Sequence, residues 1–405
     1  MRTFTIGLLR EGKVPPDKRV PLTPQQAVEI QQRFPNVSVI VQSSLLRAYR
    51  DEEYIEEGIS VKEDVSGCDI LMGVKEVPIT ELLEGKTYLF FSHTIKKQPY
   101  NRKLLQAILE KQIRLIDYEA IKDKLGNRLV AFGRYAGIVG AYNGLWTYGK
   151  RTGSFSLRRA HECFDVNDLK LELRKIKLPP NTKIILTGAG RVGKGAMETL
   201  DSAGIRKVSP SDFLHGTFDE PVYVQLSSAD YHTRIEGGHF NREEFHLHPE
   251  LYHSHFLDFT RVADILIAGA YWNPKAPILF SREDMQRQDF KVKVIADVTC
   301  DIDGSIPSTK IATTIAEPVY DYDPITDSMQ PACSSSQYIT TMTIDNLPCE
   351  LPRSASEEFG QDLINRVLPL LIHEDVDDII MRATMTQNGK LTPAFQYLQD
   401  YVDGR

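Results

Sequence analysis

The chain has 405 residues, of which 41% are hydrophobic and 25% are charged, and its net charge is −7. A single hydrophobic core rarely grows beyond roughly 250 to 300 residues, so this length predicts two domains. The residue balance is that of a globular protein, and no basic run offers a surface for nucleic acid or anionic lipid. We therefore expect a small-molecule substrate, no nucleic-acid partner and no membrane.

The N-terminus and the cysteines indicate a cellular compartment. Residues 1–10 form a short strand pattern without the apolar stretch of a signal peptide, and no run has the length of a membrane span. The five cysteines are scattered and lack a C-x-x-C spacing, which is typical of a reducing environment. They are Cys68, Cys163, Cys300, Cys333 and Cys349. These features predict a cytoplasmic protein without disulfides, and they leave the oligomeric state open.

The first third of the chain alternates short apolar strands with amphipathic helices, which predicts a parallel α/β sheet. The expected strands are 37–41, 70–74, 88–92 and 113–116, and the clearest helix is 24–34, opened by Thr23 as its N-cap. The small-residue stretch 133–144 would let a helix approach a neighbouring backbone very closely. We expect this helix to join the two domains.

A second domain begins after Pro179 and Pro180, which mark a boundary. Its expected elements are a strand at 183–187, a helix at 194–201, and strands at 265–268 and 292–296. Residues 354–371 have helical periodicity and would return to the first domain. The predicted fold class is α/β, with two Rossmann-like domains, parallel sheets and an interdomain cleft. Residues 1–150, completed by about 310–405, would form the substrate domain, and residues 180–309 the dinucleotide-binding domain.

The strand at 183–187 runs directly into the turn Gly188-Ala189-Gly190-Arg191-Val192-Gly193. A helix N-terminus offers free N–H groups and the positive end of a dipole to a pyrophosphate, and glycines permit the tight turn and the close backbone approach. Asp212 follows at about the distance typical of the acid that binds a ribose hydroxyl. The turn therefore predicts a bound nicotinamide dinucleotide.

The sequence leaves the choice between NAD and NADP open. Arg191, Arg206 and Lys207 lie near enough along the chain to bind the additional phosphate of NADP. The acid Asp212 favours NAD slightly.

Lys75 and His93 each follow a predicted strand, at the edge where α/β sheets place groups that contact ligands. Histidine titrates near neutrality, and burial or a neighbouring cation lowers the pKa of lysine toward that range, so the pair suits proton transfer. Taken alone, each residue is more often a surface lysine or a histidine at the core edge, but the pair at successive strand ends favours a function. Arg19 and Arg128 have the geometry to bind carboxylates with two hydrogen bonds, or to be solvated surface arginines.

Several short motifs follow one another in a fixed order. They are KRVPLTP at 18–24, GVK at 73–75, FFSHTIK at 90–96, RLIDYE at 114–119, VAFG at 130–133 before YAG at 135–137, GAYW at 269–272, DVTCD at 297–301 before GSI at 304–306, and IDNLP at 344–348. With these motifs the chain resembles, nearly end to end, the lysine-2-oxoglutarate reductase and lysine-forming saccharopine dehydrogenase group. That group belongs to the alanine dehydrogenase and transhydrogenase superfamily.

The resemblance implies reversible oxidation of saccharopine, a secondary amine that joins lysine to a glutarate skeleton, into L-lysine and 2-oxoglutarate. It implies acid–base roles for Lys75 and His93, with Glu119 adjusting their protonation through its charge. The implied substrate contacts are Arg19, Lys75, Gln98, Arg128, Phe132, Ala270 and Tyr271. The implied dinucleotide contacts are Gly188, Ala189, Gly190, Arg191, Gly193, Asp212, Gly269, Cys300 and Asp301, with Asp301 near the nicotinamide.

Two departures from the family pattern leave alternatives open. Asn127-Arg128 stands where the fungal lysine-forming enzymes carry two arginines, and residues 213–259 form a longer stretch than in those enzymes. An alanine dehydrogenase-like enzyme, or a nucleotide-binding regulator without catalysis, would keep the same fold. We expect no metal, because the histidines between 239 and 255 lack the spacing of a zinc site.

Overall fold

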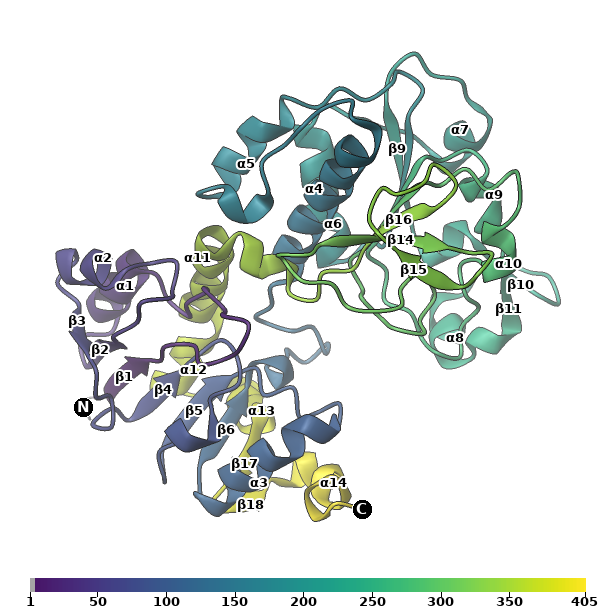
Figure 1. The fold of residues 1–405 in the computed structure, drawn as a ribbon. Coiled ribbons are helices and arrows are strands. Elements are labelled where there is room, and N and C mark those ends of the chain that lie inside the picture. The colour runs from purple at the N-terminus through teal and green to yellow at the C-terminus, as the bar shows by residue number, and fades with distance from the viewer. Residues whose placement is uncertain (1–3) are drawn as a thin grey trace. The chain divides into compact units, whose positions relative to one another are not determined.

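The computed structural model describes residues 4–405, which divide into two compact units (Figure 1). The first unit contains the chain up to Phe132 together with Pro352–Arg405, and the second contains Gly133–Leu351. Residues 133–150 and 310–351, which the sequence placed with the substrate domain, therefore fall in the second unit. Residues 1–3 of the expected N-terminal strand lie outside the described residues, and the strand itself is β1 (Phe4–Leu8).

The first unit is built on an eight-stranded sheet with the order β18-β17-β6-β5-β4-β1-β2-β3. Its parallel strands are β1, β2 (Val37–Gln42), β3 (Ser60–Lys62), β4 (Ile70–Met72), β5 (Thr87–Phe90) and β6 (Arg114–Asp117). Two C-terminal strands, β17 (Thr384–Gln387) and β18 (Lys390–Leu391), add an antiparallel edge. The helices are α1 (Pro24–Arg33), α2 (Asp51–Glu56), α3 (Arg102–Glu110), α11 (Pro352–Asp362), α12 (Leu368–Ile372), α13 (Ile379–Ala383) and α14 (Gln399–Asp403).

The expected N-cap of α1 is confirmed. The Thr23 hydroxyl accepts a hydrogen bond from the Gln26 N–H, and the Gln26 side chain accepts one from the Thr23 N–H in return. Pro24 occupies the first turn, where its missing N–H costs nothing. The helix buries Ala27 and Ile30 against the sheet.

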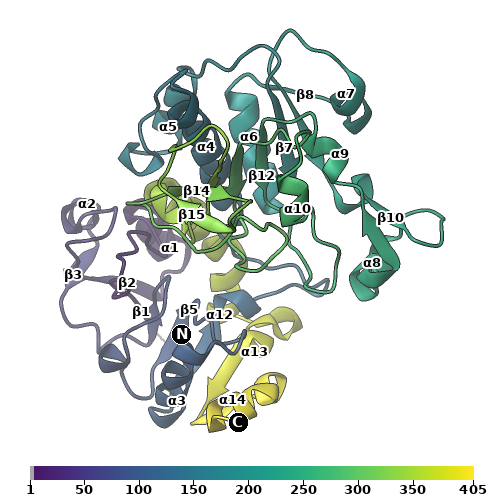
Figure 2. The same cartoon turned by 45° about the vertical axis from the view of Figure 1, so that its right-hand side comes forward.

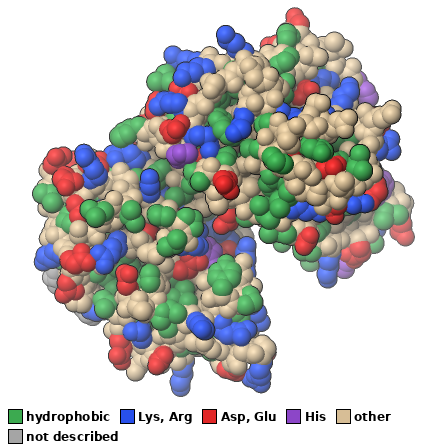
Figure 3. All heavy atoms as spheres, viewed as in Figure 1, with side chains coloured by type: hydrophobic (Ala, Val, Ile, Leu, Met, Phe, Trp, Pro, Cys, Tyr) green, Lys and Arg blue, Asp and Glu red, His purple; other side chains and the backbone are tan. Residues whose placement is uncertain are grey.

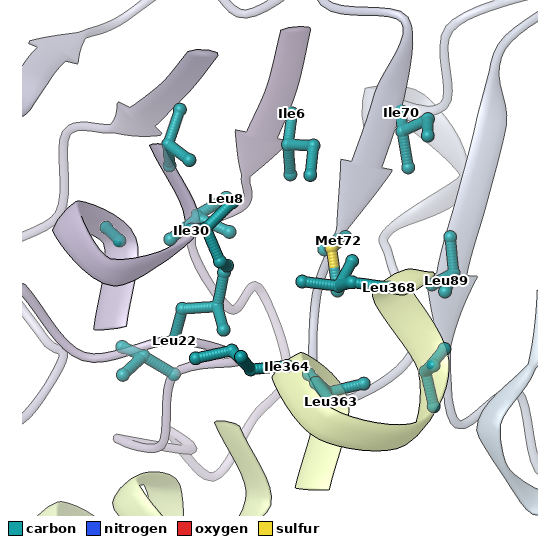
Figure 4. Packing of buried hydrophobic residues seen from close by; sticks show 14 of the residues in the cluster. Ile6, Leu8, Leu22, Ile30, Ile70, Met72, Leu89, Leu363, Ile364 and Leu368 are labelled. Carbon is teal, nitrogen blue, oxygen red and sulfur yellow. The ribbon is translucent and has the colours of Figure 1, made fainter. Parts of the chain in front are cut away.

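The C-terminal segment returns to the first unit, as the periodicity of residues 354–371 predicts. Figure 4 shows Leu363, Ile364 and Leu368 from this segment facing strand residues such as Ile6 and Met72. All five side chains are almost completely buried. Removing this much apolar surface from water stabilises the fold, so the two distant parts of the chain form one core.

The second unit has its own eight-stranded sheet, with the order β15-β14-β16-β13-β12-β7-β9-β8. Its parallel strands are β7 (Lys183–Thr187), β8 (Arg206–Lys207), β9 (Val222–Leu226), β12 (Ile265–Ala268), β13 (Val294–Asp297) and β16 (Ile339–Met342), and β14 (Val319–Asp323) and β15 (Ser328–Gln330) form an antiparallel edge. The helices are α4 (Gly133–Thr152), α5 (Val166–Leu173), α6 (Arg191–Ser202), α7 (Pro210–His215), α8 (Arg242–Leu247), α9 (Leu257–Thr260) and α10 (Arg282–Met285). The α/β fold class is therefore confirmed, with antiparallel edges that the sequence did not predict.

Between β9 and β12 the chain forms a separate small hairpin, β10 (His232–Arg234) with β11 (Tyr252–Ser254), and carries α8 beside it (Figure 2). This hairpin lies within residues 213–259, the stretch that we expected to be longer than in the fungal lysine-forming enzymes. Phe245, Tyr252 and Ala276 form its small apolar cluster.

The glycine-rich helix α4 packs directly on α6, the helix that follows the glycine turn. A Cβ atom on Gly137 would overlap the Val192 carbonyl oxygen, and one on Gly195 would overlap the Arg134 carbonyl oxygen. Glycines on both helices therefore allow their backbones to touch, which confirms the close approach predicted for residues 133–144. The partner helix lies within the same unit.

Charged side chains of both signs are mixed over the face shown in Figure 3. Within residues 4–405, no helix combines the length and apolar character needed to cross a bilayer. All five cysteines are free thiols.

Candidate active site

In the first unit, ionisable residues follow the ends of adjacent parallel strands. Glu11 comes after β1, Lys75 after β4, His93 after β5 and Glu119 after β6, each two or three residues beyond the strand. These four strands are neighbours in the sheet, in the order β6-β5-β4-β1. Their carboxyl ends share one edge, so the fold gathers residues that are far apart in sequence.

His93 is held in place by Glu76. Its Nδ1 lies 2.7 Å from Glu76 Oε1, and the other oxygen of this carboxylate lies 3.3 Å from Lys13 Nζ. Burial opposes ionisation of Glu76, but the hydrogen bond and the charge of His93 lower its pKa to about 2. An ionised carboxylate only accepts hydrogen bonds, so Nδ1 carries a proton and Nε2 is the nitrogen that can exchange one.

The His93 ring is further positioned by its backbone and by Phe91. The residue has a left-handed backbone conformation, with φ of 53°. Its ring stacks on Phe91 at 6.3 Å between centroids and an angle of 18°. The side chain remains 28% exposed, which leaves the ring accessible from solvent.

Lys75 lies in a loop anchored by Glu11. The two carboxyl oxygens of Glu11 accept hydrogen bonds from the Val74 and Lys75 N–H groups at 2.6 and 2.8 Å. Burial lowers the pKa of Lys75, and the nearby charges of Arg19 and Lys13 lower it further. A lysine with a lowered pKa can act as a base closer to neutral pH.

Glu11 itself is unusual, because enclosure of its carboxyl group and the charge of Asp17 raise its pKa to about 8. The two backbone N–H donors oppose this shift but do not cancel it. Near neutral pH the carboxyl group of Glu11 is therefore largely protonated.

Arg19 binds a carboxylate of its own unit. Its Nε and Nη2 donate to the two oxygens of Asp17 at 3.0 and 2.6 Å, and the residues are only 3% and 2% exposed. The guanidinium also lies 4.1 Å from the centre of the Phe132 ring. The two-pronged geometry predicted for a substrate carboxylate is thus present, with Asp17 as its partner.

Arg128 and Glu119 form an ion pair, and the Arg128 side chain is largely exposed. The Glu119 N–H donates to Asp117 at 2.7 Å. The structure therefore pairs Glu119 with Arg128, while Glu76 contacts His93.

Gln98 and Phe132 are held by neighbouring aromatic side chains. The Gln98 amide oxygen accepts a hydrogen bond from the Tyr100 hydroxyl. Phe132 stacks on Phe359 at 4.4 Å between centroids. Both side chains therefore contact aromatic neighbours within the first unit.

The second unit contains the glycine turn between β7 and α6. Gly188 has φ of 102°, and a Cβ there would come within 2.9 Å of the Gly269 carbonyl oxygen. A Cβ on Gly193 would overlap the Gly188 carbonyl oxygen. Gly190 is the exposed N-cap of α6, and a Cβ added there would meet no atom within 4 Å. This concave backbone at a helix N-terminus fits a dinucleotide pyrophosphate.

Gly269 lies against the glycine turn. The Thr187 hydroxyl accepts hydrogen bonds from the Gly269 and Ala270 N–H groups at 3.2 and 3.4 Å. Tyr271 follows with an exposed side chain. The motif at 269–272 therefore begins beside the turn that it was expected to accompany.

Asp297, at the end of β13, organises the loop that carries Cys300 and Asp301. Its carboxylate accepts hydrogen bonds from the Cys300 N–H at 3.3 Å and from the Thr309 hydroxyl at 2.6 Å. Burial raises the pKa of Cys300, whose Sγ donates to the Thr343 carbonyl oxygen at 2.7 Å. Cys300 therefore stays a thiol, as expected of a packing residue rather than a nucleophile.

The topology separates Asp212 from the glycine turn. Asp212 lies in α7 after β8, and β9 is inserted between β8 and β7. Its carboxylate accepts a hydrogen bond from Ser209 at 2.7 Å. The residue that reaches the turn is Gln225 of β9, which donates to the Gly188 carbonyl oxygen at 3.3 Å. The spacing rule for the ribose acid assumes that the second strand pairs with the first, and here it does not.

Four residues of this site have no role that the sequence predicts: Glu11, Lys13, Asp17 and Glu76. A local signal existed for two of them, since Glu76 directly follows Lys75 and Asp17 precedes Arg19 by two positions. Glu11 can be recognised as a neighbour of Lys75 only once the pairing of β1 with β4 is known.

Comparisons with known proteins give relatives in sequence and in fold. Residues 7–139 match the family model described as alanine dehydrogenase/PNT, N-terminal domain. The chain is 32% identical over 99% of its length to the mitochondrial alpha-aminoadipic semialdehyde synthase of Mus musculus, and 26% identical over 87% to the saccharopine dehydrogenase [NAD(+), L-lysine-forming] of Neurospora crassa. The chain is thus similar, over most of its length, to a saccharopine dehydrogenase and to part of an alpha-aminoadipic semialdehyde synthase.

The chain spans 48% of the mouse protein and 88% of the Neurospora crassa protein. Among solved structures, L-alanine dehydrogenase matches with a TM-score of 0.65 at 17% identity, covering 98% of this chain and 99% of that one. A transhydrogenase from Sinorhizobium meliloti matches with a TM-score of 0.59 at 15% identity, covering 96% and 100%. These structural matches show the shared fold.

Proposed function

We propose that the chain interconverts saccharopine with L-lysine and 2-oxoglutarate, using a nicotinamide dinucleotide. The observation that carries this proposal is the pairing of Lys75, whose pKa is lowered, with the Glu76-bound His93 at one sheet edge. The printed names of the relatives, a saccharopine dehydrogenase and an alpha-aminoadipic semialdehyde synthase, support the substrate class. The dinucleotide would accept or supply the hydride.

Lys75 would act as the base toward the substrate amine. Hydride leaves a carbon next to nitrogen only when the nitrogen lone pair is available, so the secondary ammonium must first lose a proton. A buried lysine with a lowered pKa is suited to take that proton.

His93 would serve the hydrolytic half of the reaction. Addition of water to the substrate imine gives a carbinolamine, and its C–N bond then breaks to release the lysine amine and the 2-oxo acid. Both steps move protons, which Nε2 can supply and remove while Glu76 holds Nδ1–H. The ionised Glu76 also stabilises the imidazolium formed on the way.

Arg19, Arg128 and Gln98 would bind the carboxylates of the substrate, next to Phe132. Each arginine already contacts a protein carboxylate, Asp17 or Glu119. Bound substrate would therefore share Arg19 with Asp17 and compete with Glu119 for the more exposed Arg128.

We propose either NAD or NADP as the cofactor of the second unit. The residues that would hold it are those of the glycine turn, Gly269 and the loop with Cys300 and Asp301. The sequence favours NAD slightly because of Asp212. In the structure, however, Asp212 follows β8, one strand beyond β9, and hydrogen-bonds to Ser209. Activity should therefore be measured with both cofactors.

The decisive assay follows oxidation of NADH and of NADPH in parallel, with L-lysine and 2-oxoglutarate as substrates. We expect turnover with at least one cofactor. Pyruvate with ammonia at equal or better efficiency would instead favour an alanine dehydrogenase. Cofactor binding without turnover on either substrate pair would favour a non-catalytic nucleotide-binding protein.

A further inference from the structure

A small pocket in the second unit opens among segments that follow three parallel strands. Ser228 and His232 come after β9, Tyr271 and Trp272 after β12, and Ser305 after β13. The pocket encloses about 30 Å³. It therefore lies at the carboxyl edge of the sheet, the same edge that carries the glycine turn after β7.

The pocket contains a buried acceptor with no partner. His232 is 5% exposed, and its Nδ1 lies 3.1 Å from the Ser228 carbonyl oxygen. A carbonyl oxygen only accepts, so Nδ1 carries the proton and Nε2 is left as an acceptor. Within residues 4–405, Nε2 is buried and has no hydrogen-bond partner. Burial lowers the pKa of His232 to about 4, and the neighbouring His253 and His255 act in the same direction.

The His232 ring cannot turn easily to find another partner. It packs between Tyr231 and Phe245, at 4.6 and 4.5 Å between ring centroids. His232 is also paired with Ser254 in the β10–β11 hairpin (Figure 2). A buried acceptor without a donor is costly, so a fixed one indicates that a ligand or an ordered water brings the donor.

Tyr271 at the pocket is unusually exposed for an aromatic residue, at 84%. It lies two residues after Gly269, which packs against Gly188 of the glycine turn. The enclosed space fits one water or one amino group, but it is too small for a whole ring. A flat heteroaromatic ring could therefore lie on Tyr271 while its amino substituent enters the pocket.

We propose that His232 and Tyr271 bind the adenine base of the dinucleotide. His232 Nε2 accepts a hydrogen bond from the exocyclic amino group, and the base stacks on the Tyr271 ring. The proposal rests on the proposed function, because it requires a dinucleotide at the glycine turn. It assigns Tyr271 to the cofactor, not to the amino-acid substrate as the resemblance implied.

Equilibrium binding to the full chain, measured by calorimetry, tests this assignment without any turnover. The probes are NADH and NADPH, each compared with its hypoxanthine analogue, in which an oxo group replaces the amino group. For the wild-type protein we expect the analogue to bind about tenfold more weakly, because Nε2 then faces another acceptor. In His232→Leu the two probes should bind with nearly equal affinity.

Three further variants separate this effect from a folding defect. Tyr271→Ala removes an exposed ring and should weaken both probes about fivefold, the loss typical of one aromatic stacking contact. The matched controls, His253→Leu in the same hairpin and Phe164→Ala at another exposed aromatic position, should bind like the wild type.

Equal binding of the amino and oxo probes by the wild-type protein would overturn the proposal and leave water as the donor to His232. A preference for the amino probe over the oxo probe that persists in His232→Leu would also overturn the proposal. Both results are compatible with the proposed function. Absence of binding by every dinucleotide would overturn the proposed function as well.

Discussion

The two sheets differ in what they present at their carboxyl edges. In the first unit, that edge carries Glu11, Lys75, Glu76 and His93, which contact one another or their backbones. The pKa values of Glu11, Lys75 and Glu76 are shifted from their ordinary values. In the second unit, the edge is dominated by glycines and backbone groups around Gly188. Under the proposed function, the carboxyl edge of a parallel sheet would support proton transfer in one unit and recognition of a phosphate-linked ligand in the other.

The difference arises from the groups that carry or compensate charge at each edge. The first unit buries ionisable groups and compensates them in pairs, which shifts their pKa values. In the proposed function, the second unit would bind the negative charge of a dinucleotide at a helix N-terminus, which needs close backbone approach and few side chains. Substitutions should therefore affect chemistry in the first unit and ligand affinity or packing in the second.

The largest expected effect is on catalysis in the first unit. Lys75→Met and His93→Asn should each lower kcat by about 10² to 10⁴, the usual contribution of a positioned acid or base. Steady-state kinetics with lysine and 2-oxoglutarate would measure this, beside the exposed controls Lys103→Met and His239→Asn. Dinucleotide affinity should be unchanged in both variants. Near-wild-type turnover in both would contradict the assigned roles.

The next effect is on the stability of the second unit. Gly137→Ala forces a methyl group into the Val192 carbonyl oxygen, where backbone rather than a flexible side chain must move. We expect a loss of about 1 to 3 kcal/mol in the free energy of unfolding, as for other overpacked sites. Urea denaturation would measure this loss. Gly67→Ala meets no atom within 4 Å and provides the control.

The first unit should show two opposite pH dependences of stability. Glu76 has a folded pKa near 2, below its ordinary value of 4.5, so its contribution is lost as pH falls between these values. Glu11 has a folded pKa near 8, above 4.5, so stability is lost as pH rises between these values.

Unfolding free energies measured from pH 3 to pH 9 would test these two signs. Glu76→Gln should flatten the acidic part of the curve, and Glu11→Gln the part between about 4.5 and 8. Parallel curves for wild type and variant in either range would contradict the corresponding assignment.

The smallest effect concerns Asp212. If the ribose is bound near β9, Asp212→Ala should change NADH and NADPH affinity less than about twofold, because β9 separates it from the turn. Gln225→Ala removes the hydrogen bond to Gly188 and should weaken binding by about two- to tenfold, the range for one net hydrogen bond. A larger loss in Asp212→Ala than in Gln225→Ala would restore Asp212 as the ribose ligand.

Much of the secondary structure followed from local pattern. The strands at 183–187 and 265–268 have the predicted bounds, and the capped helix at 24–34 ends within one residue of its prediction. Strands and helix starts depend on apolar patterns and capping residues that span only a few positions. The sequence alone can therefore predict them. The domain bounds were less accurate, because α4 and residues 310–351 join the second unit through packing on distant elements.

By itself, the sequence determined the glycine turn, its flanking strand and helix, and the positions of Lys75 and His93 after two strands. Only the tertiary structure decided which carboxylate binds His93, that Glu11 anchors the Lys75 loop, and that β9 comes between β7 and β8. The physical reason is that strand order and register depend on pairing between segments far apart in the chain. Such pairing brings residues such as Glu11 and Lys75 into contact across 64 positions, where no local pattern connects them.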